Sequence, residues 1–211
     1  MTKDPGPLIA PDTQADKSAL RREMRRRRRE LSADQRFHRG RAMSRIITAL
    51  PLFRNSRRIA LFLATDGEMD PGTVMQHAQA MDKQVFLPVL AGSPRRVGLR
   101  FVRHAPGEVL VANRFGIPEP LPDPGRVINP RFLDLVMAPL VAFDDHGNRL
   151  GMGGGYYDRT FEFLRLRRSW RKPRLIGVAH EFQRLAALPR EPWDVPLSGV
   201  VTEAGFRNLD G

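Results

Sequence analysis

After Pro51, short apolar runs rich in β-branched and aromatic residues alternate with turn signals and with stretches of helical periodicity. Six of these runs predict strands, at residues 59–64, 85–89, 99–102, 135–138, 175–179 and 200–202. Apolar positions at helical spacing predict helices over residues 71–81 and 155–168. Strands that alternate with helices are typical of an α/β fold. We therefore expect a single three-layer domain with a mixed, largely parallel sheet and helices on both faces.

The segment before Pro51 predicts two helices, the first of them strongly basic. A mostly polar helix with a narrow apolar stripe is expected from Lys17 onward. The stripe consists of Leu20, Met24 and Leu31. Ser32 begins the sequence Ser-Ala-Asp-Gln, a capping box in which each of the two outer side chains bonds the backbone N–H of the other residue. A second helix is therefore expected over residues 33–50.

Two segments lack a regular pattern. Residues 1–16 hold three prolines, a glycine and few large apolar groups, which predicts a disordered leader ahead of one α/β domain over residues 17–211. Residues 105–130 hold six prolines and little periodicity, so we expect a long surface loop there.

The composition excludes several classes of protein. With 41% hydrophobic residues, the 211-residue chain can bury a sizeable core. It has no cysteine, which excludes disulfides and thiolate metal sites. The longest apolar run, residues 135–143, is too short to cross a bilayer and contains Pro139, and the N-terminus does not resemble a signal peptide. We therefore expect a soluble, cytoplasmic protein with no membrane partner.

The net charge of +12 raises the question of nucleic-acid binding. Twelve Lys and Arg residues and three carboxylates lie between Lys17 and Arg45, so this segment carries most of the net charge. A nucleic-acid-binding protein that uses the arginine-rich helix is therefore an alternative function. Such a helix is expected to place aromatic side chains among its arginines, and this segment offers only Phe37. We do not expect nucleic acid as the partner, and residues 25–29 are expected to be mainly a solvated helix face.

Helical geometry divides these basic residues between faces. Lys17 and Arg21 are four residues apart and therefore share a face, and Arg25 and Arg28 stay near it. Three arginines are expected to point well away from that face: Arg26, Arg27 and Arg29.

A glycine-rich segment lies between a strand-like run and a helix-like run. Residues 149–158 read Arg-Leu-Gly-Met-Gly-Gly-Gly-Tyr-Tyr-Asp. Glycines let the backbone approach a ligand closely, and the N–H groups at the start of the following helix suit a phosphate. The segment is neither a Walker A loop nor G-x-G-x-x-G, because no Lys-Ser or Lys-Thr follows and Tyr156 occupies the third glycine position. Glycines alone are equally consistent with a tight turn.

The neighbours of the glycines favour a ligand site over a mere turn. Arg149 can pair with phosphate, and Asp158 can bind Mg²⁺. Tyr156 and Tyr157 can pack against a planar ring or donate a hydrogen bond. Because adjacent residues on a helix point in different directions, one of the two tyrosines is expected to fill the core.

The segment Gly147-Asn-Arg-Leu-Gly-Met-Gly-Gly-Gly-Tyr-Tyr-Asp158 resembles the signature of the 5-formyltetrahydrofolate cyclo-ligases, also called 5,10-methenyltetrahydrofolate synthetases. The similarity continues, in the same order and spacing, over nearly the whole chain after the leader. It includes Lys17-Ser-Ala-Leu-Arg21, Phe62-Leu-Ala-Thr-Asp-Gly-Glu68, Pro139 to Arg159, Gly177-Val-Ala-His180 and Pro192-Trp-Asp-Val-Pro196.

The resemblance implies an enzyme that uses ATP and Mg²⁺, with Lys17, Arg149 and Tyr156 as catalytic residues. The implied nucleotide-binding residues are Lys17, Arg21, Arg149, Leu150, Gly151, Met152, Gly153, Gly154, Gly155, Tyr156 and Tyr157. The implied folate-binding residues are Leu63, Glu68, Met152, Gly153, Gly154, Gly155 and Tyr156. Asp158 and Asp194 are implied to hold Mg²⁺. Position 154 is lysine in some relatives, so Gly154 leaves Lys17, Arg21 and Arg149 as the main cations.

The resemblance also implies a reaction. The formyl oxygen on N5 of 5-formyltetrahydrofolate, with or without a polyglutamate tail, attacks the γ-phosphate of ATP. N10 then attacks the activated carbon and phosphate leaves, which gives 5,10-methenyltetrahydrofolate and ADP. Such chemistry needs positioning and charge neutralisation rather than a covalent nucleophile, and this chain shows no cysteine and no serine-histidine pattern. We expect a monomer that acts on this small molecule.

Several of these residues also have simpler interpretations. A carboxylate such as Glu68 after a strand end is commonly solvated, and Asp194 near two prolines is typical of a turn. His146 and His180 have no partner at metal-ligand spacing, so we expect them to be structural or solvated. A different small-molecule kinase or sugar-phosphate enzyme on a similar scaffold is a further alternative, but it leaves the matches at Lys17, Glu68 and Asp194 unexplained.

Overall fold

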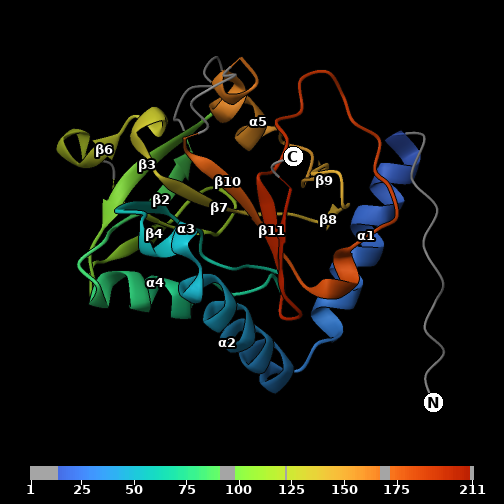
Figure 1. Ribbon diagram of the computed structural model, residues 1–211, viewed down its shortest axis with the longest axis horizontal. Helices are drawn as coiled ribbons and strands as arrows, with labels where there is room; N and C mark the ends of the chain where they lie inside the picture. Colours follow the sequence, from blue (N-terminus) through green and yellow to red (C-terminus); the bar gives the residue numbers. More distant parts are fainter. Residues whose placement is uncertain (1–13, 91–97, 122, 167–171, 210–211) are drawn as a thin grey trace.

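The computed structural model describes residues 14–90, 98–121, 123–166 and 172–209. In these residues, one eight-stranded sheet has the order β12-β11-β10-β7-β1-β2-β3-β6 (Figure 1). Its strands are β1 Arg58–Ala60, β2 Gln84–Leu90, β3 Leu99–His104, β6 Val127–Ile128, β7 Leu135–Pro139, β10 Arg174–Val178, β11 Gly199–Val201 and β12 Phe206–Asn208. The five central strands, from β11 to β2, are parallel, and β12, β3 and β6 are antiparallel to their neighbours. The predicted mixed, largely parallel sheet is confirmed.

Helices cover both faces of this sheet (Figure 1). They are α1 Gln14–Glu30, α2 Ala33–Ala49, α3 Pro51–Arg54, α4 Gly72–Ala80 and α5 Tyr156–Phe161. Successive strand residues point to opposite faces, so Ile59 packs with Met43 of α2 and Val74 of α4, whereas Ala60 packs with Phe161 of α5. The predicted three-layer arrangement is confirmed.

The first two helices start close to where the sequence predicts. Helix α1 begins at Gln14, three residues before the predicted Lys17, and residues 1–13 of the predicted leader lie outside the described part of the chain. The capping box of α2 forms as expected. The Gln35 N–H donates to Ser32 Oγ at 3.1 Å, and the Ser32 N–H donates to Gln35 Oε1 at 2.9 Å.

Helix α1 packs through its narrow apolar stripe. Leu20 and Met24 pack with Val141, Ala142 and Leu150, which lie at a small hairpin beside the main sheet. The hairpin consists of β8 Ala142–Phe143 and β9 Arg149–Leu150. This packing places α1 next to the glycine-rich segment that follows β9 (Figure 1). Among the described residues, no helix combines the length and the apolar character needed to cross a membrane.

Two predicted elements are shorter than expected. The strand predicted over 59–64 ends at Ala60, because the chain then leaves the sheet for a turn in which Asp66 and Gly67 have φ values of 51° and 73°. The helix predicted over 155–168 ends as an α-helix at Phe161 and continues as a 3₁₀ turn, η3 Glu162–Leu164. Its last two predicted residues lie outside the described part of the chain.

The long loop predicted over 105–130 is wrong in part, because the segment holds regular structure. Strands β4 Leu110–Ala112 and β5 Pro118–Pro120 form a hairpin, followed by the 3₁₀ turn η1 Pro124–Arg126 and by β6. The prolines of β5 disrupt the strand pattern in the sequence. A short strand at the edge of a two-stranded sheet can nevertheless contain proline. Two further 3₁₀ turns are η2 Pro130–Phe132 and η4 Glu181–Gln183.

Candidate active site

The glycine-rich segment is held between β9 and α5. Asp144 supports the turn before β9, since its carboxylate accepts the backbone N–H groups of His146, Asn148 and Leu188. Gly153 and Gly155 have φ values of 99° and 60°, a region that favours glycine. The glycine loop, residues 151–155, therefore turns sharply from β9 into α5.

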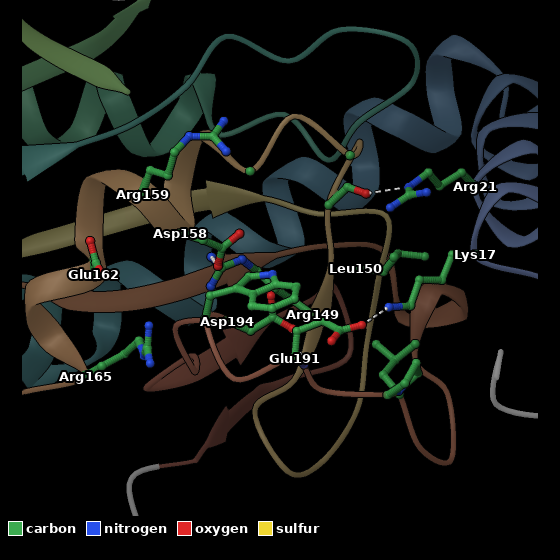
Figure 2. Close-up of a pocket in the computed structure, with 16 residues that line it drawn as sticks. Lys17, Arg21, Arg149, Leu150, Asp158, Arg159, Glu162, Arg165, Glu191 and Asp194 are labelled. Carbon is green, nitrogen blue, oxygen red and sulfur yellow. Dashed lines mark hydrogen bonds and ion pairs between the residues drawn. The ribbon is translucent and has the colours of Figure 1, made fainter. Parts of the chain in front are cut away.

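A basic cavity of about 510 Å³ opens on one side of this loop (Figure 2). Helix α1 contributes Lys17 and Arg21, strand β9 contributes Arg149, and two carboxylates, Asp158 and Asp194, also line the cavity. Most of the implied nucleotide-binding residues line it: Lys17, Arg21, Arg149, Leu150, Gly151, Gly153 and Gly155. Residues far apart in the sequence are thus brought together around a space large enough for a small polar ligand.

The three cations of the basic cavity differ in their surroundings. Lys17 Nζ lies 2.9 Å from Glu191 Oε1, and Arg21 Nε donates to the Gly151 carbonyl at 2.9 Å. Arg149 is almost completely buried and pairs with Asp158 Oδ1 at 2.5 Å. Burial lowers the pKa of Arg149, and the nearby carboxylates oppose this shift. Lys17 and Arg21 are therefore the more adjustable cations, whereas Arg149 is fixed in place.

The two carboxylates suit a divalent cation. The hydrogen bonds that Asp158 accepts within the described structure both end on Oδ1, and the one that Asp194 accepts, from the Glu191 N–H, ends on Oδ2. Each carboxylate keeps one oxygen available. Burial raises the pKa of Asp194, with a smaller contribution in the same direction from the charge of Asp158. Among the described residues, no group of three or more His, Cys, Asp or Glu side chains that could hold a metal ion is found.

A second, apolar cavity of about 750 Å³ lies on the other side of the loop. Of the implied folate-binding residues, Leu63, Glu68, Met152, Gly154, Gly155 and Tyr156 line it. Gly153 lines only the basic cavity, whereas Met152, Gly154, Tyr156 and Tyr157 line only the apolar one. The loop thus presents successive residues to different cavities, a division that the sequence could not reveal.

Glu68 is the buried acid of the apolar cavity. Its side chain is only 12% exposed, so it is not the solvated carboxylate that its position after a strand suggested. Its Oε2 accepts the Thr65 N–H at 3.0 Å, and Arg28 Nη1 lies 3.7 Å from Oε1. Burial raises the pKa of Glu68, while the Thr65 N–H and the Arg28 charge oppose that shift.

The two tyrosines have different environments. The hydroxyl of Tyr156 accepts a hydrogen bond from Arg114 Nη2 at 3.2 Å, and Arg159 lies over its ring. Tyr157 stacks on Phe161 within the core, and burial raises the pKa of its hydroxyl. Tyr157 therefore fills the core while one side of it reaches the apolar cavity, in line with the expectation for one of the pair.

The two cavities meet on the glycine loop. Four residues line both of them: Arg149, Gly151, Gly155 and Asp158. A ligand in the basic cavity and a ligand in the apolar cavity would therefore approach each other beside a buried cation and a carboxylate.

Several lining residues were not identified from the sequence. In the basic cavity they include Arg159, Glu162, Arg165, Glu191 and Trp193, and in the apolar cavity they include Asn113, Phe115, Ile117 and Glu119. Trp193 precedes Asp194 and is 61% exposed, so an aromatic beside an implied metal ligand was an available signal. The residues named for the apolar cavity belong to the β4–β5 hairpin, and the sequence of this segment shows no strand pattern.

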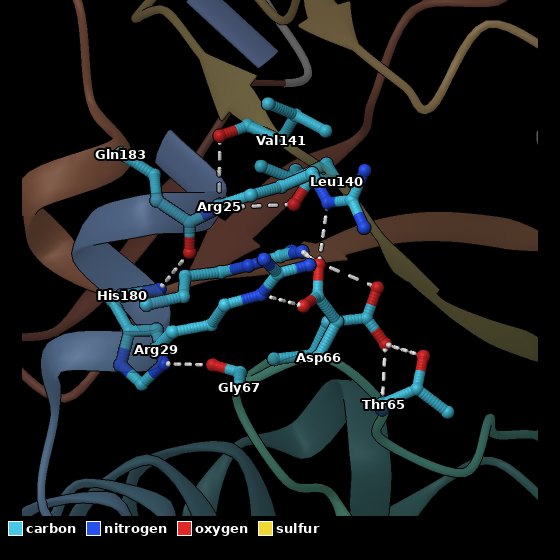
Figure 3. A network of polar contacts seen from close by, with 11 residues as sticks. Arg25, Arg29, Thr65, Asp66, Gly67, Leu140, Val141, His180 and Gln183 are labelled. Atoms are coloured by element: carbon cyan, nitrogen blue, oxygen red, sulfur yellow. Dashed lines mark hydrogen bonds and ion pairs between the residues drawn. The ribbon is translucent and has the colours of Figure 1, made fainter. Parts of the chain in front are cut away.

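The arginine run is largely paired within the protein (Figure 3). Arg25, Arg28 and Arg29 all reach the carboxylate of Asp66. Arg26 pairs with two carboxylates of its own helix, and Arg27 lies over a ring, 4.6 Å from the centroid of Phe182. Arg29, which was expected to point well away from the face of Lys17 and Arg21, reaches the same carboxylate as Arg25 and Arg28. Arg26 and Arg29 remain 59% exposed, so part of the run is a solvated face, although each of its arginines has a partner within the protein.

The histidines behave as expected. His180 is buried, its Nε2 donates to the Gly67 carbonyl at 3.1 Å, and its ring stacks on Phe182, which makes it structural (Figure 3). His146 is exposed in the turn before β9.

Replacing single glycines separates a ligand effect from a folding effect. A Cβ at Gly151 would meet no protein atom within 4 Å, so Gly151→Ala should leave the free energy of unfolding within about 0.5 kcal/mol of the wild-type value. If phosphates occupy that space, the methyl group should weaken ATP binding about tenfold. Gly155→Ala should instead destabilise the fold by about 1 to 2 kcal/mol, because Gly155 has a φ of 60°. Denaturant unfolding and calorimetric ATP titration measure both effects, and unchanged ATP binding in Gly151→Ala would remove the phosphates from this loop.

Comparison with known proteins agrees with the fold and with the sequence signature. The profile of the 5-formyltetrahydrofolate cyclo-ligase family matches residues 13–203. The chain is 40% identical over 183 residues to the 5-formyltetrahydrofolate cyclo-ligase of Escherichia coli K12, covering 85% of this chain and 96% of that protein. It is 36% identical over 184 residues to the Haemophilus influenzae cyclo-ligase, covering 86% and 95%. The solved structure of Aquifex aeolicus 5,10-methenyltetrahydrofolate synthetase is 34% identical, with a TM-score of 0.77 over 92% of this chain and 93% of that one.

These matches cover most of the chain and most of each relative. The chain therefore belongs to the 5-formyltetrahydrofolate cyclo-ligase family. The predicted family and the predicted class of enzyme, a ligase of folate metabolism, are confirmed.

Proposed function

We propose that this protein converts 5-formyltetrahydrofolate to 5,10-methenyltetrahydrofolate, with hydrolysis of ATP to ADP and phosphate in the presence of Mg²⁺. The observation that carries the proposal is the meeting of a basic and an apolar cavity on the glycine loop, in a chain of this family. A reaction between a phosphate and a folate needs this arrangement, since the two reacting groups must come within bonding distance.

The basic cavity provides for the triphosphate. Lys17 and Arg21 approach from α1 and Arg149 from β9, and the glycines between them leave the backbone exposed to an incoming phosphate. Fixed positive charges that face the transferring phosphoryl group stabilise the charge that develops on it. Asp158 and Asp194 would hold Mg²⁺, which supplies further neutralisation of the phosphates.

The apolar cavity provides for the folate. Its apolar lining, which includes Leu63 and Met152, suits a planar ring system, and the buried Glu68 carboxylate suits the N–H groups on one edge of a pteridine. Tyr156, on the glycine loop, would hold the ring against the nucleotide side. This orientation directs the N5 formyl group towards the residues shared by both cavities.

The proposed chemistry has two steps. The formyl oxygen attacks the γ-phosphorus, the bond from that phosphorus to the bridging oxygen breaks, and ADP leaves. N10 then attacks the formyl carbon and loses its proton, and phosphate departs with the former formyl oxygen. Arg149 remains beside both steps, because it lines both cavities.

The test is a turnover assay with the purified protein, 5-formyltetrahydrofolate, ATP and Mg²⁺, followed by the ultraviolet absorbance of the methenyl product. Product is expected only when ATP is present. No ATP-dependent product at any enzyme concentration would refute the proposed activity. The cytoplasmic location, the monomeric state and any preference for a polyglutamate tail stay predictions.

Asp194 offers the cleaner test of the proposed magnesium site. Asp194→Asn keeps an oxygen for the Glu191 N–H, so the fold should persist while the Mg²⁺ concentration needed for half-maximal turnover rises about tenfold. Asp158→Asn should also weaken the fold, by about 3 to 5 kcal/mol, because the buried Arg149 loses its paired carboxylate. Magnesium titrations of turnover check the first effect. An unchanged Mg²⁺ requirement in both variants would exclude these residues as metal ligands.

A further inference from the structure

Arg28 differs from the other arginines that reach Asp66. The side chains of Arg25 and Arg29 are 38% and 59% exposed, whereas that of Arg28 is 1% exposed. The turn at Gly67 packs directly against the backbone of Arg28. A Cβ at Gly67 would lie 2.7 Å from the Arg28 carbonyl oxygen, so a larger residue there would push the turn away.

The hydrogen bonding of Arg28 is incomplete. Its Nη2 lies 3.2 Å from Asp66 Oδ2, but Nε and Nη1 have no hydrogen-bond partner among the described residues. A buried donor without a partner is unfavourable for folding. Arg28 is not needed to attach α1 to this turn, because Arg25 and Arg29 already bond Asp66 from the surface (Figure 3). The unpaired side of Arg28 therefore has another role.

The side of the Arg28 guanidinium that has no hydrogen-bond partner faces Glu68. Arg28 Nη1 lies 3.7 Å from Glu68 Oε1, too far for a hydrogen bond but close for two charges shielded from water. Both residues line the apolar cavity. The charged and titratable groups that act on Glu68 are Arg28 from α1, Asp66 from its own turn and Tyr157 from α5, and Arg28 alone of these carries positive charge.

We propose that Arg28 is a positioning residue, which keeps Glu68 ionised and fixed in orientation so that the carboxylate can accept hydrogen bonds from the N–H groups of the folate ring. The proposal rests on the proposed function of the apolar cavity. An ionised carboxylate offers acceptors on both oxygens, whereas a neutral one carries a proton that competes with the ligand's own donors. Burial favours the neutral form of Glu68, and the charge of Arg28 at 3.7 Å opposes this shift.

The matched pair of variants is Arg28→Met and Arg29→Met. Both remove one arginine from Asp66, but only the first removes the cation that faces Glu68. Calorimetry without ATP gives the dissociation constant for 5-formyltetrahydrofolate from about pH 6 to about pH 9. Carbon-13 NMR of the ligand-free protein gives the pKa of Glu68 directly. Arg28→Lys, which keeps the charge, tests for rescue and serves where Arg28→Met folds poorly.

Arg28→Met is expected to raise the pKa of Glu68 and to weaken folate binding about tenfold at neutral pH. Because the carboxylate ionises above its pKa, affinity should recover as the pH rises. Arg29→Met should bind like the wild type at every pH, and Arg28→Lys should restore most of the affinity. An unshifted Glu68 pKa in Arg28→Met, or equal and pH-independent losses in both methionine variants, would overturn the proposal. Absence of folate binding by the wild type would instead refute the proposed function, while the NMR titration still decides whether Arg28 controls Glu68.

Discussion

Lys17→Ala and Arg21→Ala are each expected to raise the KM for ATP about ten- to a hundredfold, with a much smaller effect on the KM for 5-formyltetrahydrofolate. Each side chain lines the basic cavity from the same face of α1. A lost charge-assisted contact to phosphate corresponds to about 1.5 to 3 kcal/mol, which gives this range. Lys17 must leave Glu191 to reach a phosphate, so the observed effect should lie towards the lower end at that position.

The matched control for these variants is Arg26→Ala. Arg26 is exposed, and among the described residues it pairs only with Glu23 and Glu30 of its own helix, so its removal should leave the KM for ATP unchanged. Arg27 and Arg29 are unsuitable controls, since each contacts another part of the protein. Steady-state kinetics of the three single variants make the comparison. Equal losses at all three positions would show that the helix acts as a general electrostatic field rather than through two specific phosphate ligands.

Glu68→Gln is expected to raise the KM for 5-formyltetrahydrofolate about ten- to a hundredfold and to leave the KM for ATP almost unchanged. The amide has nearly the shape of the carboxylate and can still accept the Thr65 N–H, so the fold should be retained. It has lost the negative charge and one acceptor, however, and hydrogen bonds to a charged group are the stronger kind.

Glu119→Gln is the control for that prediction. Glu119 lines the same cavity, but its Oε1 accepts bonds from the Leu90 N–H and the Asn113 amide, which a glutamine oxygen can also accept. Its substitution should change the folate KM by less than about threefold. If both variants lose the same affinity, the cavity responds to any lost charge and Glu68 is not a specific folate ligand.

The part of the fold that the sequence could predict is its core. Strands β2, β7 and β10 carry continuous apolar runs because they are buried on both faces, and such runs are visible without a structure. The capping box at Ser32 located α2 within a residue. Strands of two or three residues, such as β4, β5, β8 and β9, are too short to show a period, and tertiary contacts decide them.

The site was predictable to different degrees. Arg149 and Asp158 follow from chemistry beside the glycines, because they are neighbours in the sequence. Lys17, Glu68 and Asp194 lie on other segments, and only the family resemblance connected them to the loop. Packing decides which cavity each loop residue faces.

The arginine run illustrates a different limit. Counting charges along the sequence suggested a surface for an acidic partner. In the fold, however, Arg25, Arg28 and Arg29 all pair with one carboxylate, that of Asp66. Its carboxylate lies 37 residues along the chain from Arg29, so no local pattern links the two. A run of like charges therefore says little about binding until its partners in the fold are known.

Transfer of the γ-phosphoryl group to the formyl oxygen, at the place where the two cavities meet, is the central claim, and the fate of that oxygen tests it directly. The substrate for the measurement is 5-formyltetrahydrofolate labelled with heavy oxygen in its formyl group, incubated with the protein, ATP and Mg²⁺. Mass spectrometry of the released phosphate should find one labelled oxygen for each methenyl product formed. Label recovered in water, with unlabelled phosphate, would contradict the account, because ATP would then be hydrolysed without activating the formyl group.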